Sequence, residues 1–284
     1  MIHILPHEHR GDFSPDEVNL RAGQDVSRFL LGRPRLFLPS GRRAIAAVLA
    51  SLALKPADEV YISNSTGQTY ISSCVTCTVF NFCQPTRVLT KNTRAILVIH
   101  EYGIPHPDLR DLVSEGRERG IPVIEDCAHS MDSTVDGRPI GCFGDYAVYS
   151  LSKIFPVQAG GMLVGQELPC IELDGIDREA AGAAEREFRR HGPFLGWLSS
   201  RRRQNFTALR HFFRSYAVLF ELDSCITPYF FGVILADALR IRRESNAIQW
   251  GSTLRNDLLL IPTNPMIESE RLLRAVKEVL DADG

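Results

Sequence analysis

This 284-residue sequence lacks the features that mark membrane, secreted and nucleic-acid-binding proteins. No apolar run approaches the roughly 20 residues that a membrane-spanning helix needs. The first residues, MIHILPHEHRGDF, lack the basic start and apolar stretch of a secretory signal. Neither sign of charge dominates, since the formal net charge is −2 at pH 7. We therefore expect no membrane and no nucleic acid among its partners.

Cysteine is present, but not in the pattern of a disulfide framework or a zinc site. The seven cysteines are scattered along a long chain, which is typical of reduced thiols in a cytoplasmic protein. Cys74 and Cys77 form a CxxC without a second pair, so a plain helical pair is favoured over a zinc or redox site. His3, His7 and His9 lie near the terminus and are a weak metal signal. We expect no metal.

The sequence does contain apolar strands that alternate with helices. The run RAILVIH at 94–100 is typical of a parallel strand covered on both faces. A helix follows from Pro107 to about Arg119, Gly120 ends it, and PVIED begins the next strand. This succession predicts an α/β fold. The pattern changes after residue 167, so we expect a large α/β domain at 1–167 and a small C-terminal domain at 168–284.

The stretch 122–164 carries the main chemical signal. One strand ends in the pair Glu125-Asp126, the next leads to Lys153, and the pair Gly160-Gly161 opens a third. In α/β proteins, ligands bind at the carboxyl ends of the strands. A lysine that can form a Schiff base, near an acid that can pair with a pyridine nitrogen, indicates pyridoxal phosphate (PLP) as cofactor.

A phosphate site is indicated upstream, where LFLPSGRRAIAAV reads as a strand, a turn and a helix. Ser40 is a good N-cap, and Gly41 allows close approach of a ligand to the backbone. The amides of Gly41, Arg42 and Arg43 would then form an anion seat at the helix N-terminus. A plain capped helix is the alternative. Tyr70, at the end of the next loop, could stack on a cofactor ring or be a core aromatic.

Five segments occur in an order that is familiar from one protein family. They are PSGRRAI with DEVYIS, AILVIHEYG, VIEDCAHSM, GRPIGCFGDYAVYSLSK with GGMLV, and LLLIPTNPM before a last helix. Over about 36–165 and 228–282 the chain resembles the DegT/DnrJ/EryC1/StrS family of PLP-dependent sugar aminotransferases, as a compact member. The resemblance implies fold type I (aspartate aminotransferase-like), with a mostly parallel central sheet, helices on both faces and a smaller C-terminal α+β part.

The resemblance also implies roles for individual residues. Lys153 matches the Schiff-base lysine, although a surface lysine is the alternative. Asp126 matches the acid beside the pyridine nitrogen, and otherwise would be a strand-end carboxylate. His129 falls where the family carries Gln or His near the ring hydroxyl, and a core histidine is the alternative.

The remaining matches concern the cofactor phosphate, the ring face and the substrate side. They are Gly41 and Arg42 in the phosphate-binding turn, Ser150 (or Ser152) as a phosphate hydroxyl, Tyr70 as the stacking aromatic, and His100 and Tyr102 as substrate-lining residues. The chain departs from the family in a shortened segment between Cys83 and Thr93. It also lacks the Gly-x-Asn-x-Arg-like segment that reaches the neighbouring subunit's phosphate.

The function implied is a PLP-dependent aminotransferase that holds the cofactor as an internal aldimine on Lys153. Its substrates would be a keto sugar, expected to be nucleotide-linked, and an amino-acid donor, in polysaccharide or secondary-metabolite sugar biosynthesis. A cytoplasmic homodimer is expected. The alternatives are another PLP-dependent reaction (dehydratase or lyase) and a non-catalytic fold type I relative. The family's sugar dehydratases replace the lysine with histidine, so Lys153 disfavours that version. A dinucleotide enzyme ranks last because no GxGxxG follows an early strand.

Overall fold

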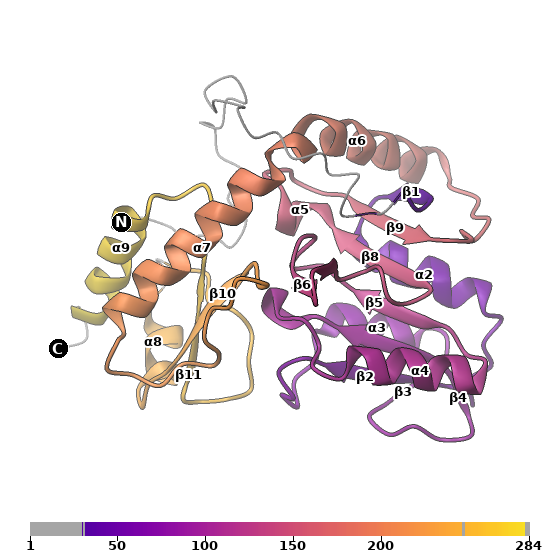
Figure 1. Ribbon diagram of the computed structural model, residues 1–284, viewed down its shortest axis with the longest axis horizontal. Helices are drawn as coiled ribbons and strands as arrows, with labels where there is room; N and C mark the ends of the chain where they lie inside the picture. The colour runs from indigo at the N-terminus through magenta and orange to yellow at the C-terminus, as the bar shows by residue number, and fades with distance from the viewer. Residues whose placement is uncertain (1–29, 31, 246–247, 282–284) are drawn as a thin grey trace.

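A seven-stranded sheet forms the larger part of the molecule (Figure 1). The computed structural model describes residues 30, 32–245 and 248–281, so His3, His7 and His9 lie outside the described residues. The strands are β1 (Arg35–Leu38), β2 (Glu59–Asn64), β3 (Gln84–Thr86), β4 (Thr93–Ile99), β5 (Val123–Asp126), β8 (Tyr146–Ser150) and β9 (Gly161–Gly165).

Their order across the sheet is β1-β9-β8-β5-β4-β2-β3. Strands β3, β2, β4, β5 and β8 are parallel, whereas β9 and β1 are added antiparallel at one edge. The expected mostly parallel sheet is confirmed. Because β5 and β8 are parallel neighbours, Asp126 and Ser150 end at the same edge of the sheet.

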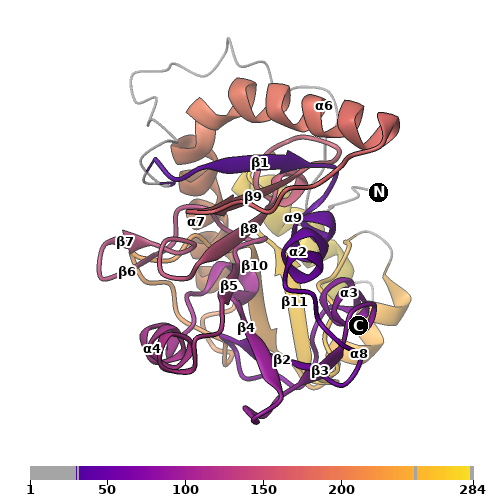
Figure 2. The ribbon, with the colours of Figure 1, turned by 90° about the vertical axis from the view of Figure 1, so that its right-hand side faces the viewer.

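Helices cover both faces of the sheet, as expected. Helices α2 (Gly41–Ser51) and α3 (Ser73–Phe80) lie on one face and α4 (Leu109–Arg119) on the other (Figure 2). The alternation of side chains in β4 explains why its run is apolar throughout: Leu97 packs in the core under α2, and Ile96 and Val98 pack under α4. Short segments complete this part: η2 (Glu101–Gly103), β6 (Thr134–Val135), β7 (Arg138–Pro139), α5 (Leu151–Ile154) and η3 (Gly192–Phe194).

Local signals fix the helix ends. The Ser40 hydroxyl caps α2 by accepting a hydrogen bond from the Arg43 amide at 3.3 Å. Gly120 ends α4 in the left-handed conformation, with φ of 64°. The same helix begins at Leu109 rather than at Pro107, because the Asp108 amide bonds to the His106 ring and is kept outside the first turn.

The C-terminal part is built on an antiparallel pair, β10 (Phe230–Ile234) and β11 (Leu258–Pro262). Helices α7 (Leu195–Phe212), α8 (Ala238–Glu244) and α9 (Ser269–Asp281) pack around it in a core of their own. In the part of the chain that the structure describes, no helix is both long and apolar enough to cross a membrane.

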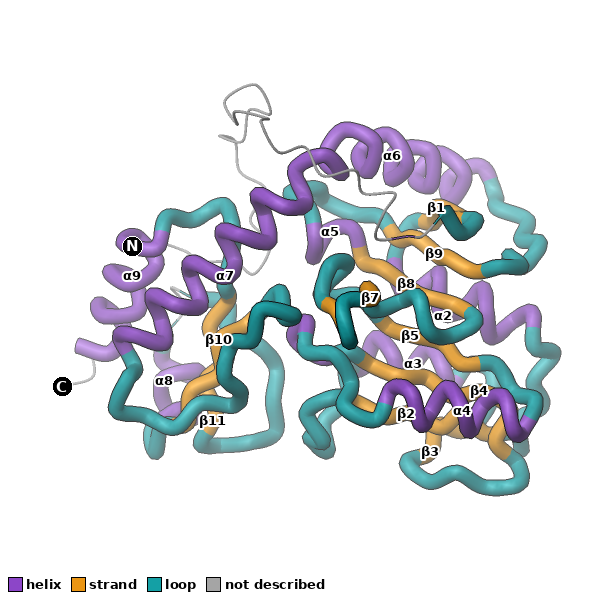
Figure 3. The backbone as a smooth tube through the Cα atoms, in the orientation of Figure 1, coloured by secondary structure: helices purple, strands orange, loops and turns teal. Residues whose placement is uncertain are grey.

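Helix α7 connects the two cores (Figure 3). Helix α6 (Gly175–His191) packs on β1, and its Phe188 shares the core of the sheet with Leu198 at the start of α7. Phe206, two turns further along α7, belongs to the C-terminal core. The packing therefore changes from one core to the other inside α7. The boundary expected at residue 167 stays a prediction.

Backbone contacts fasten the C-terminal part to the carboxyl edge of the sheet. The Ser133 hydroxyl donates to the Gly103 carbonyl at 2.7 Å and accepts from the Thr227 amide at 2.9 Å. The Tyr229 amide donates to the Tyr102 carbonyl at 2.7 Å. Gly103 has φ of 86°, and a Cβ there would overlap the Thr227 carbonyl, so the junction requires glycine.

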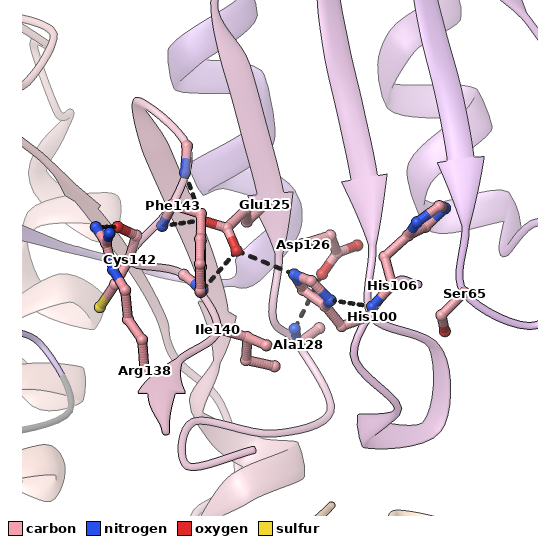
Figure 4. A network of polar contacts seen from close by, with 12 residues as sticks. Ser65, His100, His106, Glu125, Asp126, Ala128, Arg138, Ile140, Cys142 and Phe143 are labelled. Atoms are coloured by element: carbon pink, nitrogen blue, oxygen red, sulfur yellow. Dashed lines mark hydrogen bonds and ion pairs between the residues drawn. The ribbon is translucent and has the colours of Figure 1, made fainter. Parts of the chain in front are cut away.

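A buried carboxylate, Glu125, organises the same edge (Figure 4). It accepts hydrogen bonds from the amides of Gly141, Phe143 and Gly144 at 2.7–2.8 Å and lies 3.1 Å from Nε2 of His100. Burial alone would raise the pKa of Glu125, but these hydrogen bonds, with His100 the largest contributor among them, hold that pKa below its ordinary value. Glu125 thereby ties the loop after β7 to β5, next to Asp126.

We predict that Glu125→Gln destabilises the protein by about 3 kcal/mol, because one amide NH2 would face backbone donors in a buried site. The measurement is urea unfolding with linear extrapolation. The matched control is Glu115→Gln, which removes an exposed i,i+4 partner of Arg119 and should cost less than about 0.5 kcal/mol.

The contribution of Glu125 to stability should also depend on pH. Since the folded-state pKa of Glu125 is lowered, this contribution is present above the unfolded-state pKa and is lost as pH falls through the folded-state pKa. Equal losses of unfolding free energy in Glu125→Gln and Glu115→Gln would show that the buried hydrogen bonds of Glu125 do not stabilise the fold.

Candidate active site

A cavity of about 210 Å³ lies at the carboxyl edge of the sheet, between its strand ends and the C-terminal part. Five of the residues expected from the sequence line it: Tyr70, Tyr102, Asp126, His129 and Lys153. The location is the one that the strand directions predict for a ligand site in an α/β protein.

Asp126 and Lys153 bring opposite charges into this cavity. Asp126 ends β5, is 6% exposed, and accepts a hydrogen bond from the Ala128 amide at 3.0 Å. Burial raises the pKa of Asp126, although the charge of Lys153 opposes the shift. Lys153 follows β8 on the short helix α5, and burial lowers its pKa against the opposing charge of Asp126. Both groups are therefore shifted towards their neutral forms, as in many active sites.

His129 touches the lysine directly. Its Nε2 lies 3.2 Å from Nζ of Lys153, and its Nδ1 accepts a hydrogen bond from the Tyr102 amide at 3.2 Å. Tyr102 has φ of 57°, a left-handed conformation that is uncommon for a residue other than glycine. This backbone turn aims the Tyr102 amide at the imidazole.

The helix N-terminus that the sequence predicted as an anion seat lies next to the segment that carries Lys153. A Cβ on Gly41 would lie 3.4 Å from Cβ of Ser150, so the N-terminus of α2 adjoins the start of α5. A Cβ on Gly161 would overlap the Ser40 carbonyl, so glycine is needed for this approach. In the described part of the chain, the Ser150 and Ser152 hydroxyls donate no hydrogen bond. They and the first amides of α2 are suited to an anion.

The side chain of Arg42 is engaged elsewhere. Its guanidinium donates to Sγ of Cys74 at 3.2 Å. Burial would raise the pKa of Cys74, but the hydrogen bond and charge of Arg42 lower it overall. Cys74 and Cys77 are both exposed and lie in α3, as the plain helical interpretation predicts. Arg42 thus offers its backbone amide to the seat, while its side chain contacts α3.

His100 does not reach the cavity that it was expected to line. It is fully buried and points to Glu125. Its Nδ1 accepts from the His106 amide at 3.0 Å, so Nε2 carries the hydrogen donated to the carboxylate. Both ring nitrogens have partners in the interior, which explains why the side chain supports the edge of the sheet instead of lining the site.

Sequence reasoning missed several residues that line the cavity: Glu101, Tyr229, Phe230, Gln249 and Trp250. Glu101 is 6% exposed, and its Oε2 accepts a hydrogen bond from Asn64 at 2.8 Å. The available signal was a charged residue directly after an apolar strand, in the segment IHEYG. Of the other four, Tyr229 and Phe230 lie at the start of β10, and Gln249 and Trp250 lie in the loop before β11. Nothing in the sequence alone placed these segments against the sheet.

The residues present fit PLP. An amine and an acid share one cavity, as the cofactor's aldehyde and ring nitrogen require, and an aromatic side chain, Tyr70, lies on its wall. The seat between Gly41 and Ser150 offers backbone amides and a hydroxyl for the phosphate.

Comparisons with known proteins agree with this chemistry. The model of the DegT/DnrJ/EryC1/StrS aminotransferase family, whose members are PLP-dependent, matches residues 83–171. The chain is 36% identical over 118 residues to L-glutamine:scyllo-inosose aminotransferase of Streptomyces griseus, covering 38% of this chain and 28% of that protein. It is 27% identical over 157 residues to GDP-perosamine synthase of Vibrio cholerae, covering 49% of this chain and 42% of that protein. The aligned stretches thus span less than half of either relative.

The structure of DesV from S. venezuelae superposes with a TM-score of 0.66 at 18% identity, covering 94% of this chain and 89% of that chain. This likeness shows the fold over nearly the whole molecule. The resemblance predicted from the sequence is therefore confirmed: residues 83–171 match the DegT/DnrJ/EryC1/StrS aminotransferase family, within a fold type I architecture.

Proposed function

We propose that this protein is a PLP-dependent aminotransferase that moves an amino group from an amino acid to a keto sugar. The observation that carries the proposal is the cavity in which Lys153 and Asp126 meet beside a phosphate seat. The named activity of one relative, an inosose aminotransferase, supports a keto substrate of the sugar type, and the name of the other, a GDP-perosamine synthase, supports a substrate that is linked to a nucleotide.

Each residue has a role that follows from its chemistry. When bound, PLP supplies an electrophilic carbon and a ring that withdraws electrons from the substrate. Lys153 offers the amine that would attach the cofactor and, when free, a base that can carry a proton between the substrate carbon and the cofactor carbon. Asp126 would keep a proton on the ring nitrogen, and the N-terminus of α2 with Ser150 would hold the phosphate.

The substrate side is formed by the C-terminal part and η2. Gln249, Trp250 and Ser252 face the strand ends across the cavity. We propose that this wall contacts the sugar, and that the division into a large PLP-binding domain and a small C-terminal domain serves to form the cleft. A cytoplasmic location is proposed from the cysteine pattern alone.

The first prediction from this proposed function concerns the lysine. Purified protein given PLP should develop a visible absorbance band, and Lys153→Ala should show only the spectrum of free PLP, because no other amine lines the cavity among the described residues. Lys91→Ala, at an exposed lysine, is the matched control and should behave as the wild type. A wild-type protein that binds no PLP would indicate a non-catalytic relative instead.

The second prediction concerns the acid. Asp126→Asn should still give the visible band, but bleaching of that band by glutamate or glutamine should slow by at least about 100-fold, since a neutral amide cannot hold the ring nitrogen protonated. Stopped-flow absorbance measures the rate. Asp132→Asn is a suitable control, because Asp132 neighbours the site but does not line the cavity. An unchanged bleaching rate in Asp126→Asn would show that Asp126 does not keep the ring nitrogen protonated.

The third prediction concerns assembly. A homodimer should appear in light scattering at about twice the chain mass of 31.8 kDa. Since Lys153 and Asp126 line one cavity within a single chain, mixing Lys153→Ala with Asp126→Asn subunits should restore no activity. Restoration would show that one of these two residues acts in the site of the neighbouring subunit.

A further inference from the structure

The hydrogen bonds of His129 determine which of its nitrogens carries the hydrogen. A backbone N–H can only donate, so the bond from the Tyr102 amide requires a lone pair on Nδ1. In the neutral imidazole the hydrogen then resides on Nε2. That N–H points to Nζ of Lys153, 3.2 Å away. For the contact to be a hydrogen bond, the lysine nitrogen must accept it, and only a neutral amine has the lone pair to do so.

Burial and the neighbouring charges act on the pKa of Lys153 in opposite directions. Burial lowers this pKa and is the larger effect, whereas the charges of Asp126 and Cys74 raise it. Burial, together with the charges of Lys153 and Arg202, holds the pKa of His129 well below its ordinary value. A protonated Lys153 would face the N–H of His129 donor to donor, which is repulsive. The hydrogen-bond geometry and the burial of the two side chains therefore favour the same pairing, in which both groups are neutral.

Two residues from the C-terminal part hold this pair in place. The Tyr229 ring stacks on His129, with centroids 4.6 Å apart and planes at 25°. The Arg202 guanidinium lies 4.9 Å over the Tyr229 ring and donates to the Lys153 carbonyl at 2.8 Å. Arg202 and Tyr229 are 4% and 2% exposed, so solvent competes little for these contacts. One guanidinium thus fixes both the backbone of the lysine and the ring behind the imidazole.

We propose that His129 donates a hydrogen bond that keeps Lys153 a neutral amine before any cofactor is attached, and that Tyr229 and Arg202 are the positioning residues for this pair. A neutral amine is the form that can attack a carbonyl carbon. The catalytic purpose of this hydrogen bond rests on the proposed function. The proton state of Lys153, however, can be measured in the cofactor-free chain.

The experiment is competitive labelling of the cofactor-free protein with acetic anhydride between pH 6 and about pH 11, read by mass spectrometry. The chain has only four lysines, and Lys55, Lys91 and Lys277 are exposed, so they serve as internal references. We expect the labelling midpoint of Lys153 to lie at least about one pH unit below theirs. A midpoint equal to the references would overturn the proposal.

Variants separate the hydrogen bond from simple burial. His129→Leu removes the donor but still excludes water, and should raise the Lys153 midpoint by about one pH unit. His129→Gln keeps an acceptor for the Tyr102 amide and a donor for Nζ, so it should restore the wild-type midpoint. If His129→Leu leaves the midpoint unchanged, or if His129→Gln shifts it as far, the proposal is wrong.

The positioning role has its own pair of variants. Tyr229→Leu should raise the midpoint in the same direction, because the imidazole loses the ring that holds it. Phe213→Leu is the matched control: it removes a buried ring that stacks on Phe231 in the C-terminal core, away from His129. Equal midpoints in these two variants would refute the role of Tyr229.

Adding PLP to the same variants distinguishes this inference from the proposed function. A low Lys153 midpoint without a visible band would support the hydrogen bond from His129 and refute the proposed aminotransferase function. A visible band with a Lys153 midpoint equal to that of the reference lysines would support the aminotransferase function and refute the hydrogen bond.

Discussion

The burial of the Glu125 carboxylate is the constraint on which the rest of this site depends. A buried charge is tolerated only where hydrogen bonds replace its water, and Glu125 obtains them from three backbone amides of the loop after β7 and from His100. That arrangement fixes the loop, the start of β8 and the end of β5 in one piece. Asp126, the next residue, then has a defined position at the edge of the sheet. The two acids at the end of β5 therefore have different roles. The Glu125 carboxylate faces the interior and holds the edge of the sheet together, and the Asp126 carboxylate faces the cavity.

The C-terminal part completes the chemistry of the sheet edge. The part built on the sheet supplies Lys153, Asp126 and the N-terminus of α2, but the ring that stacks on His129 and the guanidinium that donates to the Lys153 carbonyl come from beyond residue 200. The contact is made through the backbone of Tyr102, which has a left-handed conformation. The Tyr102 amide donates to His129, and the Tyr102 carbonyl accepts from the Tyr229 amide. Such strain at a non-glycine residue is characteristic of functional sites, where the surrounding contacts over-determine the conformation.

The sequence predicted the sheet and several of the residues that line the cavity because those signals are local. A strand that is apolar throughout, a Ser-Gly helix start and a lysine after a buried strand each depend on neighbouring residues only. The residues that were missed depend on tertiary contacts. Tyr229 and Trp250 look like ordinary core aromatics in the sequence, and His100 looked like a site residue because it ends a strand. Its two interior partners, Glu125 and the His106 amide, are visible only in the fold. The same limit applies to α6, whose packing on β1 no local pattern indicates.

Two histidines within this edge show how hydrogen-bond direction, rather than residue type, separates support from reactivity. Both His100 and His129 accept a backbone amide at Nδ1 and therefore present Nε2–H outward. In His100 that hydrogen meets a carboxylate, so the bond is charge-assisted and the residue is a structural anchor. In His129 it meets an amine that can exist with or without a proton, so the bond selects between two chemical states. The backbone thus assigns the tautomer in both cases, and the partner of Nε2 decides what the histidine does.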